Sequence, residues 1–450
     1  MIEIKPGMAI ELSITGFNHL GHGLGRHLGL VVFVPGTLPG ELAEVRLNKI
    51  YANHAQGELL RLLKTSQERT APFCSLFGHC GGCHLQHLNY PAQLAFKQQL
   101  LEDNLRRLGR LDLEVLPIIP SQMPFFYRNR ARLHYHKGDL GFYAAASHQI
   151  IPAKSCPLLL PALNDLLDNI WRILPTHHQQ LAPLRSITLK ANHDSSQLAL
   201  ILTSDLPLGN LDSLSCQLSQ ADQALASIWL NWGRARGGNH GPKWRLIFGQ
   251  PAIEEKLGSI RLAVSPASFL QTNWPQAKKL YNLALDALEL KEEESLIDLY
   301  CGIGSIALLA AGRVAQVAGV EEYAPAVEDA KRNAVSNQIT NVHFYAGKVE
   351  GILPRLQAAD QRPQALVLNP PRSGSSRKAL AAIGVLQAHK VVYISCNPAA
   401  LARDLRLLTE AGYQAEWARP VDMFPQVAHV ETVVSLRCQS HKISPRINQK

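Results

Sequence analysis

Residues 296–305 read Leu-Ile-Asp-Leu-Tyr-Cys-Gly-Ile-Gly-Ser, and this stretch decides the fold class of the chain. Its apolar first half predicts a strand, which the turn around Gly302 and Gly304 joins to a helix over 306–311. A second strand is expected over 317–320 and ends at Glu321. Strand, glycine turn, helix, strand and acid in this order predict a nucleoside-binding unit in which Glu321 accepts hydrogen bonds from ribose hydroxyls.

The sequence beyond about residue 266 continues the same pattern, with apolar strands alternating with helical stretches. This alternation is typical of an α/β domain with a mostly parallel sheet. The third glycine of the dinucleotide fingerprint is missing after Gly304, so S-adenosylmethionine fits the turn better than NAD.

Length and composition limit the class of protein. A chain of 450 residues predicts about two to four domains. Its apolar share of 46% and charged share of 18% exclude a disordered chain, and its net charge of +9 suits a polyanionic partner. There is no signal-peptide core and no long apolar run, so we expect a cytoplasmic protein without membrane contact.

We expect three domains. Residues 1–63 are short apolar segments broken by glycines, which predicts a small β-barrel. The segment 21–41 resembles a TRAM domain, an OB-like RNA-binding barrel, although a barrel without nucleic-acid affinity would show the same composition. Residues 64–265 form a central α+β domain, and residues 266–450 form the α/β domain.

Three arginines alternate with other residues in the segment 127–135 of the central domain. With the two-residue period of a strand, Arg128, Arg130 and Arg132 lie on one face, where guanidinium groups can meet RNA phosphates or stack on bases. A solvated strand face without a ligand is the simpler alternative.

Four cysteines of the central domain suggest a metal site. Cys74, Cys80 and Cys83 fall within ten residues, and Cys156 is the candidate fourth ligand. In a reducing compartment such thiols bind metal more often than they form disulfides. Their spacing leaves zinc and an iron–sulfur cluster both open.

A cysteine and a carboxylate are expected near the methyl donor. Cys396 follows the apolar strand 391–395, and Glu431 directly precedes the last strand, 432–436. Carbon 5 of uracil becomes nucleophilic when a thiolate adds to carbon 6, and a general base must later remove the carbon 5 proton. Cys396 and Glu431 suit these two roles. The alternative for Cys396 is a buried thiol at the end of a strand with no chemical role, and the alternative for Glu431 is an ordinary surface acid.

These features together resemble the RNA uracil-5-methyltransferase family, in its TRAM-bearing, iron–sulfur branch that methylates 23S rRNA. The resemblance rests on the four cysteines, the arginine-rich segment, and the stretches 268–273, 298–304, 395–404 and 429–431. It implies a class I, Rossmann-like methyltransferase sheet preceded by the barrel and by a central iron–sulfur domain.

The resemblance also implies the roles of individual residues. A 4Fe-4S cluster would be held by Cys74, Cys80, Cys83 and Cys156. Cys396 would be the nucleophile and Glu431 the base. The S-adenosylmethionine pocket would be lined by Gln271, Tyr300, Gly302, Gly304, Ser305, Glu321 and Asn369.

Three of these positions depart from the commonest family pattern. Tyr300 stands where phenylalanine is usual, and Ser305 replaces a frequent asparagine. Asn369 stands where the family usually has aspartate, which removes a negative charge near a cationic methyl donor.

The leading hypothesis is methylation of carbon 5 of a uridine in structured RNA, with 23S rRNA as the first candidate and tRNA as the second. Two hypotheses from other classes compete with it. The stretch 369–371 reads Asn-Pro-Pro, which is found in amino-methyltransferases, and a decayed donor site would leave only an RNA-binding protein. No obligate protein partner is implied.

Overall fold

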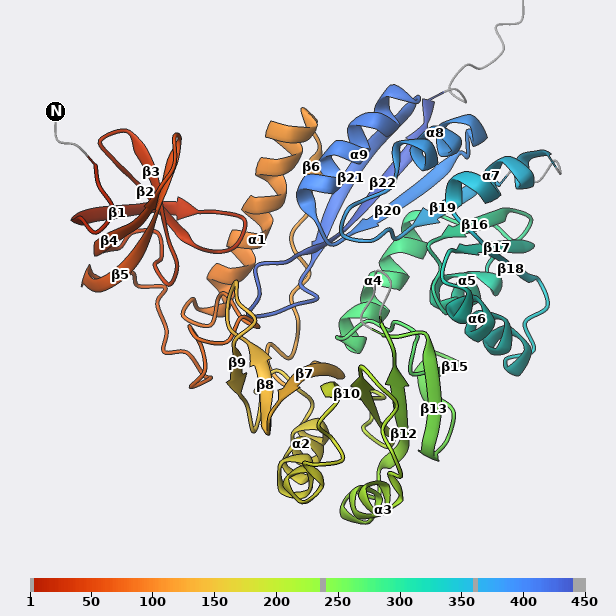
Figure 1. Cartoon of the computed structure of the whole chain (residues 1–450). Helices are drawn as coiled ribbons and strands as arrows, with labels where there is room; N and C mark the ends of the chain where they lie inside the picture. The colour runs from red at the N-terminus through yellow and green to blue at the C-terminus, as the bar shows by residue number, and fades with distance from the viewer. Residues whose placement is uncertain (1–3, 235–239, 359–362, 440–450) are drawn as a thin grey trace, which may run out of the picture. The chain divides into compact units, whose positions relative to one another are not determined.

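The structure, a computed structural model, describes residues 4–234, 240–358 and 363–439 (Figure 1). Its contacts divide the chain into two compact units. The first unit comprises Met1–Leu100, Gly141–Ala153 and Phe424–His429, and the second comprises Leu101–Leu140, Lys154–Met423 and Val430–Lys450. The expected boundaries at residues 63 and 265 follow composition rather than contacts and stay a prediction.

The first unit contains a closed barrel with the strand order β1-β2-β3-β5-β4. Its strands are β1 (Ala9–Phe17), β2 (Gly23–His27), β3 (Leu30–Val34), β4 (Leu42–Ile50) and β5 (His54–Lys64). Alternate residues such as Leu12, Val32 and Val45 point inward and form its core. Gly25 is required, because a Cβ there would lie 2.3 Å from the carbonyl oxygen of Ser13.

Three further elements, one helix and two strands, belong at least in part to the first unit. Helix α1 (Tyr90–Asn104) continues as a short π-helix, Leu105–Gly109. Strands β8 (Asp139–Tyr143) and β9 (Ile150–Pro152) pair antiparallel.

Five strands of the central part of the chain lie in the second unit in the order β13-β12-β11-β10-β7. They are β7 (Arg130–His136), β10 (Leu184–Ala191), β11 (Leu198–Ser204), β12 (Leu225–Trp232) and β13 (Lys243–Gly249). Helices α2 (Pro161–Ile173) and α3 (Asp212–Ala221) pack against each other, α2 also against β10 and α3 against β12 and β13. A short 3₁₀ helix, Leu174–His177, follows α2, and a hairpin of β14 (Ile253–Leu257) and β15 (Ile260–Val264) follows the five strands.

The second unit also holds an eight-stranded sheet with the order β18-β17-β16-β19-β20-β22-β21-β6. Its strands are β6 (Glu114–Val115), β16 (Ser295–Leu299), β17 (Gln316–Glu321), β18 (Val342–Ala346), β19 (Ala365–Leu368), β20 (Lys390–Ser395), β21 (Tyr413–Val421) and β22 (Glu431–Cys438). The strands β16 to β20 run parallel, whereas β22 runs antiparallel to β20. The expected α/β fold with a mostly parallel sheet is therefore confirmed.

Helices cover this sheet on both faces (Figure 1). The helices α7 (Val349–Ala358), α8 (Arg377–Leu386) and α9 (Pro398–Glu410) share a buried core with strand residues such as Ile297, Leu368 and Tyr393. The helices α4 (Trp274–Ala287), α5 (Ser305–Ala311) and α6 (Ala324–Ser336) pack against other strand positions. Strand order reverses between β16 and β19, and such a switch point is where open α/β sheets bind ligands.

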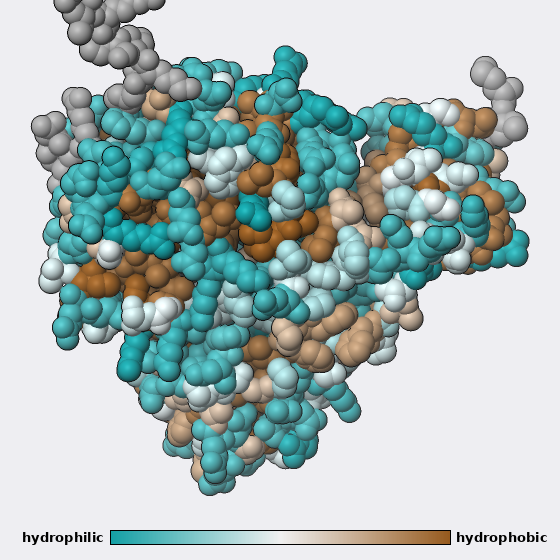
Figure 2. All heavy atoms as spheres, turned by 180° about the vertical axis from the view of Figure 1, so that it is seen from behind, coloured by the Kyte–Doolittle hydropathy of each residue, from teal (hydrophilic) through white to brown (hydrophobic). Residues whose placement is uncertain are grey.

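The surface mixes hydrophilic side chains with hydrophobic patches (Figure 2). Several large apolar residues, such as Phe269 and Phe73, are exposed. Among the residues that the structure describes, no helix has the length and apolarity needed to cross a membrane.

Candidate active site

The residues expected to react or to bind the methyl donor lie at one edge of the eight-stranded sheet, which we call the reactive edge. Parallel strands β16, β17, β19 and β20 end there, and they deliver Tyr300, Glu321, Asn369 and Cys396. The antiparallel strand β22 begins at the same edge with Glu431. Residues that are up to 131 positions apart by number are brought together because the strands share this edge.

Cys396 and Glu431 occupy neighbouring positions at the reactive edge. Ser395 pairs with Thr432, so the next position on each strand places Cys396 beside Glu431. Burial first, and then the charge of Glu431, raise the pKa of Cys396 to about 11. The thiol is therefore protonated at neutral pH in the protein alone.

Glu431 has the surroundings of a general base. It is 4% exposed, and its Oε2 has no hydrogen-bond partner in the described part of the chain. Burial raises its pKa to about 7, while Arg372 opposes the shift. A carboxyl group with a pKa near neutrality can accept and release a proton under working conditions.

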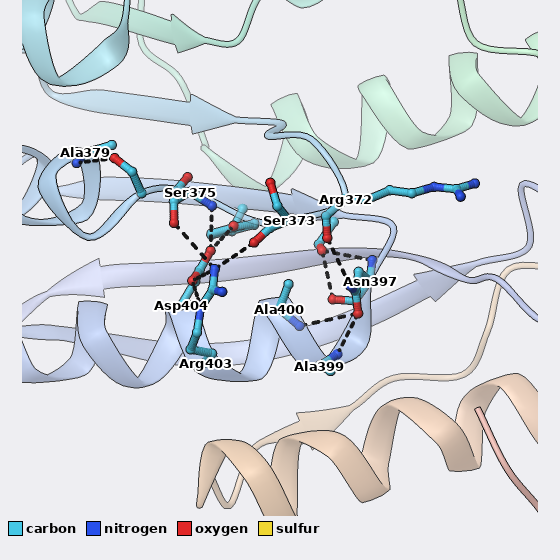
Figure 3. Close-up of polar contacts among 12 residues, drawn as sticks. Arg372, Ser373, Ser375, Ala379, Asn397, Ala399, Ala400, Arg403 and Asp404 are labelled. Carbon is cyan, nitrogen blue, oxygen red and sulfur yellow. Dashed lines mark hydrogen bonds and ion pairs between the residues drawn. The ribbon is translucent and has the colours of Figure 1, made fainter. Parts of the chain in front are cut away.

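Arg372 lies next to the candidate nucleophile and was not among the residues predicted for the site. A side-chain hydrogen bond and the charge of Arg372 both lower the pKa of Cys396, so its guanidinium favours the thiolate. The loop that carries it is tied to the cysteine turn, because the side-chain amide of Asn397 donates to the Arg372 carbonyl over 2.9 Å (Figure 3). The signal was present in the motif, where arginine follows the two prolines.

Asp404 holds the rest of this loop. Its buried carboxylate accepts a hydrogen bond from the Ser375 backbone N–H at 2.8 Å and another from the Tyr393 hydroxyl at 2.6 Å. Arg403 pairs with Asp404 and donates to the Ser373 carbonyl (Figure 3). Helix α9 therefore fixes the backbone on which Arg372 stands.

The glycine turn after β16 has the open backbone that a donor site requires. Gly302 and Gly304 have φ of 55° and 85°, which favour glycine, and a Cβ on Gly302 would meet no atom within 4 Å. Glu321 accepts hydrogen bonds from the backbone N–H of Gly302 at 3.1 Å and of Tyr323 at 2.7 Å. The turn and the acid are thus adjacent, as the sequence predicts.

The departures from the family pattern have visible consequences. The hydroxyl of Tyr300, which phenylalanine would lack, donates to Ser375 Oγ at 3.2 Å. Ser305 is buried at the first residue of α5. Asn369 is half-buried, and no hydrogen bond of its side-chain amide is found in residues 4–234, 240–358 and 363–439.

Asp298 adds a second buried acid close to the turn. It is 1% exposed, its Oδ2 accepts from the Ala307 backbone N–H at 3.0 Å, and burial raises its pKa to about 8. Its Oδ1 has no partner among the described residues. This acid was visible in the motif but had no assigned role.

Gln271 lies in a buried segment held by residues that the sequence analysis missed. Its carbonyl accepts a hydrogen bond from Asn129 at 3.1 Å. The preceding turn is fixed by the buried Lys190, whose Nζ donates to the carbonyls of Ser265, Pro266 and Ser268 at 3.2, 2.8 and 2.9 Å. A lysine in a strand is normally expected at the surface, so no local signal identified it.

Two of the three arginines lie on one strand face. Arg130 and Arg132 share a face of β7, and the residues between and beside them, Ala131 and Leu133, are buried on the other. Arg128 lies before β7 and forms a backbone bridge to Asn273.

The four expected metal ligands are divided between the two compact units. Cys74, Cys80 and Cys83 belong to the first compact unit and Cys156 to the second. Gln86 accepts from the Cys74 backbone N–H at 2.9 Å and donates to the Cys83 thiol at 3.2 Å. No group of three or more histidine, cysteine, aspartate or glutamate side chains could hold a metal among the described residues, so an iron–sulfur domain is not shown.

Comparison with known proteins bears on the whole chain. A family model for tRNA (uracil-5-)-methyltransferases matches residues 89–439, and a TRAM domain model matches residues 5–60. An uncharacterized RNA methyltransferase of Clostridium tetani is 35% identical over 446 residues, covering 96% of this chain and 97% of its own. One from Thermosynechococcus vestitus is 36% identical, covering 96% of this chain and 98% of its own.

A solved structure supports the same conclusion. Pyrococcus abyssi tRNA (uracil-54, C5)-methyltransferase, in complex with S-adenosyl-L-homocysteine, superposes with a TM-score of 0.74 and 25% identity, covering 95% of this chain and 99% of its own. The fold and the reactive edge thus define an α/β methyltransferase preceded by a TRAM barrel. The chain belongs to the tRNA (uracil-5-)-methyltransferase family and is an RNA methyltransferase of the uracil-5 type.

Proposed function

We propose that this protein transfers a methyl group from S-adenosylmethionine to carbon 5 of a uridine in structured RNA, through a covalent adduct between Cys396 and uracil carbon 6. The observation that carries the proposal is the pairing of Ser395 with Thr432, which sets the thiol of Cys396 beside the buried carboxyl group of Glu431. A nucleophile and a base at one sheet edge are the two groups that this chemistry requires.

The chain's own residues account for each step. Cys396 releases its proton to solvent, which the charge of Arg372 favours, and its thiolate adds to carbon 6, which places the electron pair of the former double bond on carbon 5 and the uracil oxygen. Carbon 5 takes the methyl group and S-adenosylhomocysteine leaves. Glu431 then accepts the carbon 5 proton, the double bond re-forms, and the Cys396 thiolate leaves.

The proposed donor pocket is lined by Gln271, Tyr300, Gly302, Gly304, Ser305, Glu321 and Asn369. The fit rests on the accessible backbone at Gly302 and on Glu321 beside it. When bound, S-adenosylmethionine supplies an electrophilic methyl group. Its positive charge suits an edge that carries Glu321, Glu431 and Asp298.

The RNA substrate is proposed in two ranks, 23S rRNA first and tRNA second. The first rests on the four-cysteine pattern and the motif resemblance, and the second on the solved tRNA (uracil-54, C5)-methyltransferase. Mapping 5-methyluridine in total RNA with and without the gene separates them. Arg128, Arg130 and Arg132 are proposed RNA contacts.

The iron–sulfur cluster on Cys74, Cys80, Cys83 and Cys156 is retained as a proposal that rests on the thiol donor set alone. It takes part in none of the steps above. Iron and sulfide analysis of anaerobically purified protein tests it. About four iron and four sulfide ions per chain are expected, and the absence of both would reject the proposal. The three-domain division and the cytoplasmic location likewise stay predictions.

The experiment for the reaction is product analysis with labelled S-adenosylmethionine and transcribed RNA. Wild-type protein should yield 5-methyluridine, Cys396→Ala should yield none, and Cys216→Ala, which changes an exposed cysteine, should retain full activity. An N-methylated base formed by Cys396→Ala would instead support the amino-methyltransferase hypothesis. Intact RNA affinity without S-adenosylmethionine binding would indicate a decayed donor site.

A further inference from the structure

One face of the five central strands carries basic, hydroxyl and aromatic side chains. Pairing across β7, β10, β11 and β12 aligns Arg132 with Thr188, Ile201 and Trp229. Directly paired residues point to the same side of a sheet, so these side chains share one face. We call it the basic face, defined by Arg130, Arg132, Thr188, Lys190, Thr203, Trp229, His240 and Trp244.

Arg130 is the most unusual member of the basic face. Burial, followed by the charge of Arg132, lowers its pKa, and no acid acts on it. No hydrogen bond or ion pair of its guanidinium is found in the described residues, whereas Lys190, its neighbour in register, is satisfied by three carbonyls. A mostly buried cation without an anion is costly, so proteins normally pair it.

An aromatic cluster adjoins this arginine. The ring of Trp244 lies 5.0 Å from that of His240 and 6.2 Å from that of Trp229, centroid to centroid. The charges of Arg130, Lys190 and Arg132 all act on His240 and lower its pKa, together with burial, to about 4. His240 is therefore neutral and stands among three cations.

Buried polar atoms of the basic face also lack partners. Trp229 Nε1, both ring nitrogens of His240, and the hydroxyls of Thr188 and Thr203 have none among the described residues. Both threonines are 0% exposed. Buried polar atoms are nearly always satisfied in folded proteins, so these exceptions indicate bound water or a polar ligand at this face. The two threonines are fully covered, so a ligand would meet Arg130 and the partly exposed rings of Trp229 and Trp244.

The chemistry of this ligand follows from the groups present. A guanidinium without an anion selects phosphate, and half-buried tryptophan rings offer a surface on which a base can stack. We propose that the basic face binds a single-stranded segment of the RNA substrate, with one phosphate on Arg130 and a base farther along the segment on Trp244. This inference rests on the proposed function for the identity of the RNA, and it adds the stacking surface of Trp244 to the arginine contacts already proposed.

The experiment measures the affinity of the full-length protein for a short labelled single-stranded oligouridine by fluorescence anisotropy at several salt concentrations. Arg130→Gln should weaken binding about tenfold or more and lower the slope of log Kd against log salt by about one phosphate contact. Trp244→Leu should weaken binding about fivefold or more.

Matched controls lie outside the basic face. Arg245→Gln changes an arginine next to Trp244 that points to the opposite side and donates to the carbonyls of Leu208 and Gly209. Trp171→Leu changes a tryptophan of α2. Each should alter the oligouridine affinity less than about twofold, because neither lies on the proposed site.

Melting temperature separates a binding role from a structural one. Arg130→Gln should leave the melting temperature unchanged or raised, since it removes an unpaired buried charge. Equal affinities of Arg130→Gln and Arg245→Gln, or unaltered binding by Trp244→Leu, would overturn the inference. Because no catalysis is measured, that result differs from a failure of the proposed function, in which wild-type protein binds RNA and forms no 5-methyluridine.

Discussion

The reactive edge and the basic face bury charges of opposite sign. At the reactive edge, Glu431 and Asp298 are buried acids, each with an oxygen that lacks a partner among the described residues. On the basic face, Arg130 is a mostly buried cation with no anion in the same part of the chain. Each region is therefore suited to a ligand of the opposite charge, a cationic methyl donor in one case and an RNA phosphate in the other.

This difference in charge explains how one chain can bind two substrates in two separate regions. Burial raises the pKa of the two acids to about 7 and about 8, so the charge of the reactive edge changes with pH around neutrality. Arg130 keeps its charge, since a guanidinium stays protonated even when burial lowers its pKa. RNA affinity should hence depend on salt, and catalysis on pH.

Glu431→Gln should have the largest effect, because the amide cannot accept the carbon 5 proton. We expect methylated product to form about 10²–10⁴ times more slowly in single-turnover assays. A covalent complex between the protein and ordinary uridine RNA should accumulate, since elimination of Cys396 is blocked. Rapid formation and release of methylated product by this variant would show that Glu431 is not the base. The affinity for oligouridine serves as the control and should equal that of the wild-type protein.

The pH profile should follow the two ionisations of the reactive edge. Glu431, with a pKa of about 7, and Cys396, with a pKa of about 11, both act after losing a proton, so the rate rises with pH. The slope of log rate against pH should fall by about one as the pH rises through about 7, because Glu431 is half ionised there and ionised almost completely at higher pH. Glu431→Gln should lose this break. A rate that declines between pH 6 and about 8 would contradict the assignment.

Lys190→Met tests a buried cation of the basic face whose ammonium group donates to three carbonyls. The change leaves three buried carbonyls without their hydrogen-bond donor, so it should lower the free energy of unfolding by about 2–3 kcal/mol in urea titrations. Lys243→Met, at an exposed position of β13, should change it by less than about 0.5 kcal/mol. Equal stability of the two variants would show that Lys190 does not hold the turn before Gln271.

Asn369→Asp should add a negative charge to the reactive edge. A carboxylate near the sulfonium should tighten S-adenosylmethionine binding about tenfold by calorimetry, with a smaller gain for the uncharged sulfur of S-adenosylhomocysteine. Gln338→Glu adds the same charge at an exposed turn and should alter neither affinity. Weaker binding by Asn369→Asp would place residue 369 outside the donor pocket.

Local patterns accounted for much of the fold. The predicted strands 296–300, 317–320 and 391–395 correspond to Ser295–Leu299, Gln316–Glu321 and Lys390–Ser395, because apolar runs and glycine turns act over a few residues. The expected barrel and the common face of Arg130 and Arg132 follow from the same periodicity.

Long-range pairing could not be predicted in the same way. The sequence does not specify that β22 inserts antiparallel beside β20, yet this pairing puts Glu431 next to Cys396. Which strands become neighbours decides that Lys190 is buried and that the rings of Trp229, Trp244 and His240 are in contact. Such contacts are properties of the whole sheet and leave no mark in a local window.

The central claim is tested most directly by trapping the covalent adduct with RNA that contains 5-fluorouridine. Fluorine at carbon 5 cannot be removed as a proton, so elimination fails after methyl transfer. Incubation with S-adenosylmethionine should give a complex that survives denaturing gels, with the nucleotide mapped by mass spectrometry to Cys396, and Cys396→Ala should give none. A trapped nucleotide on another residue, or no complex from protein that binds both substrates, would contradict the account.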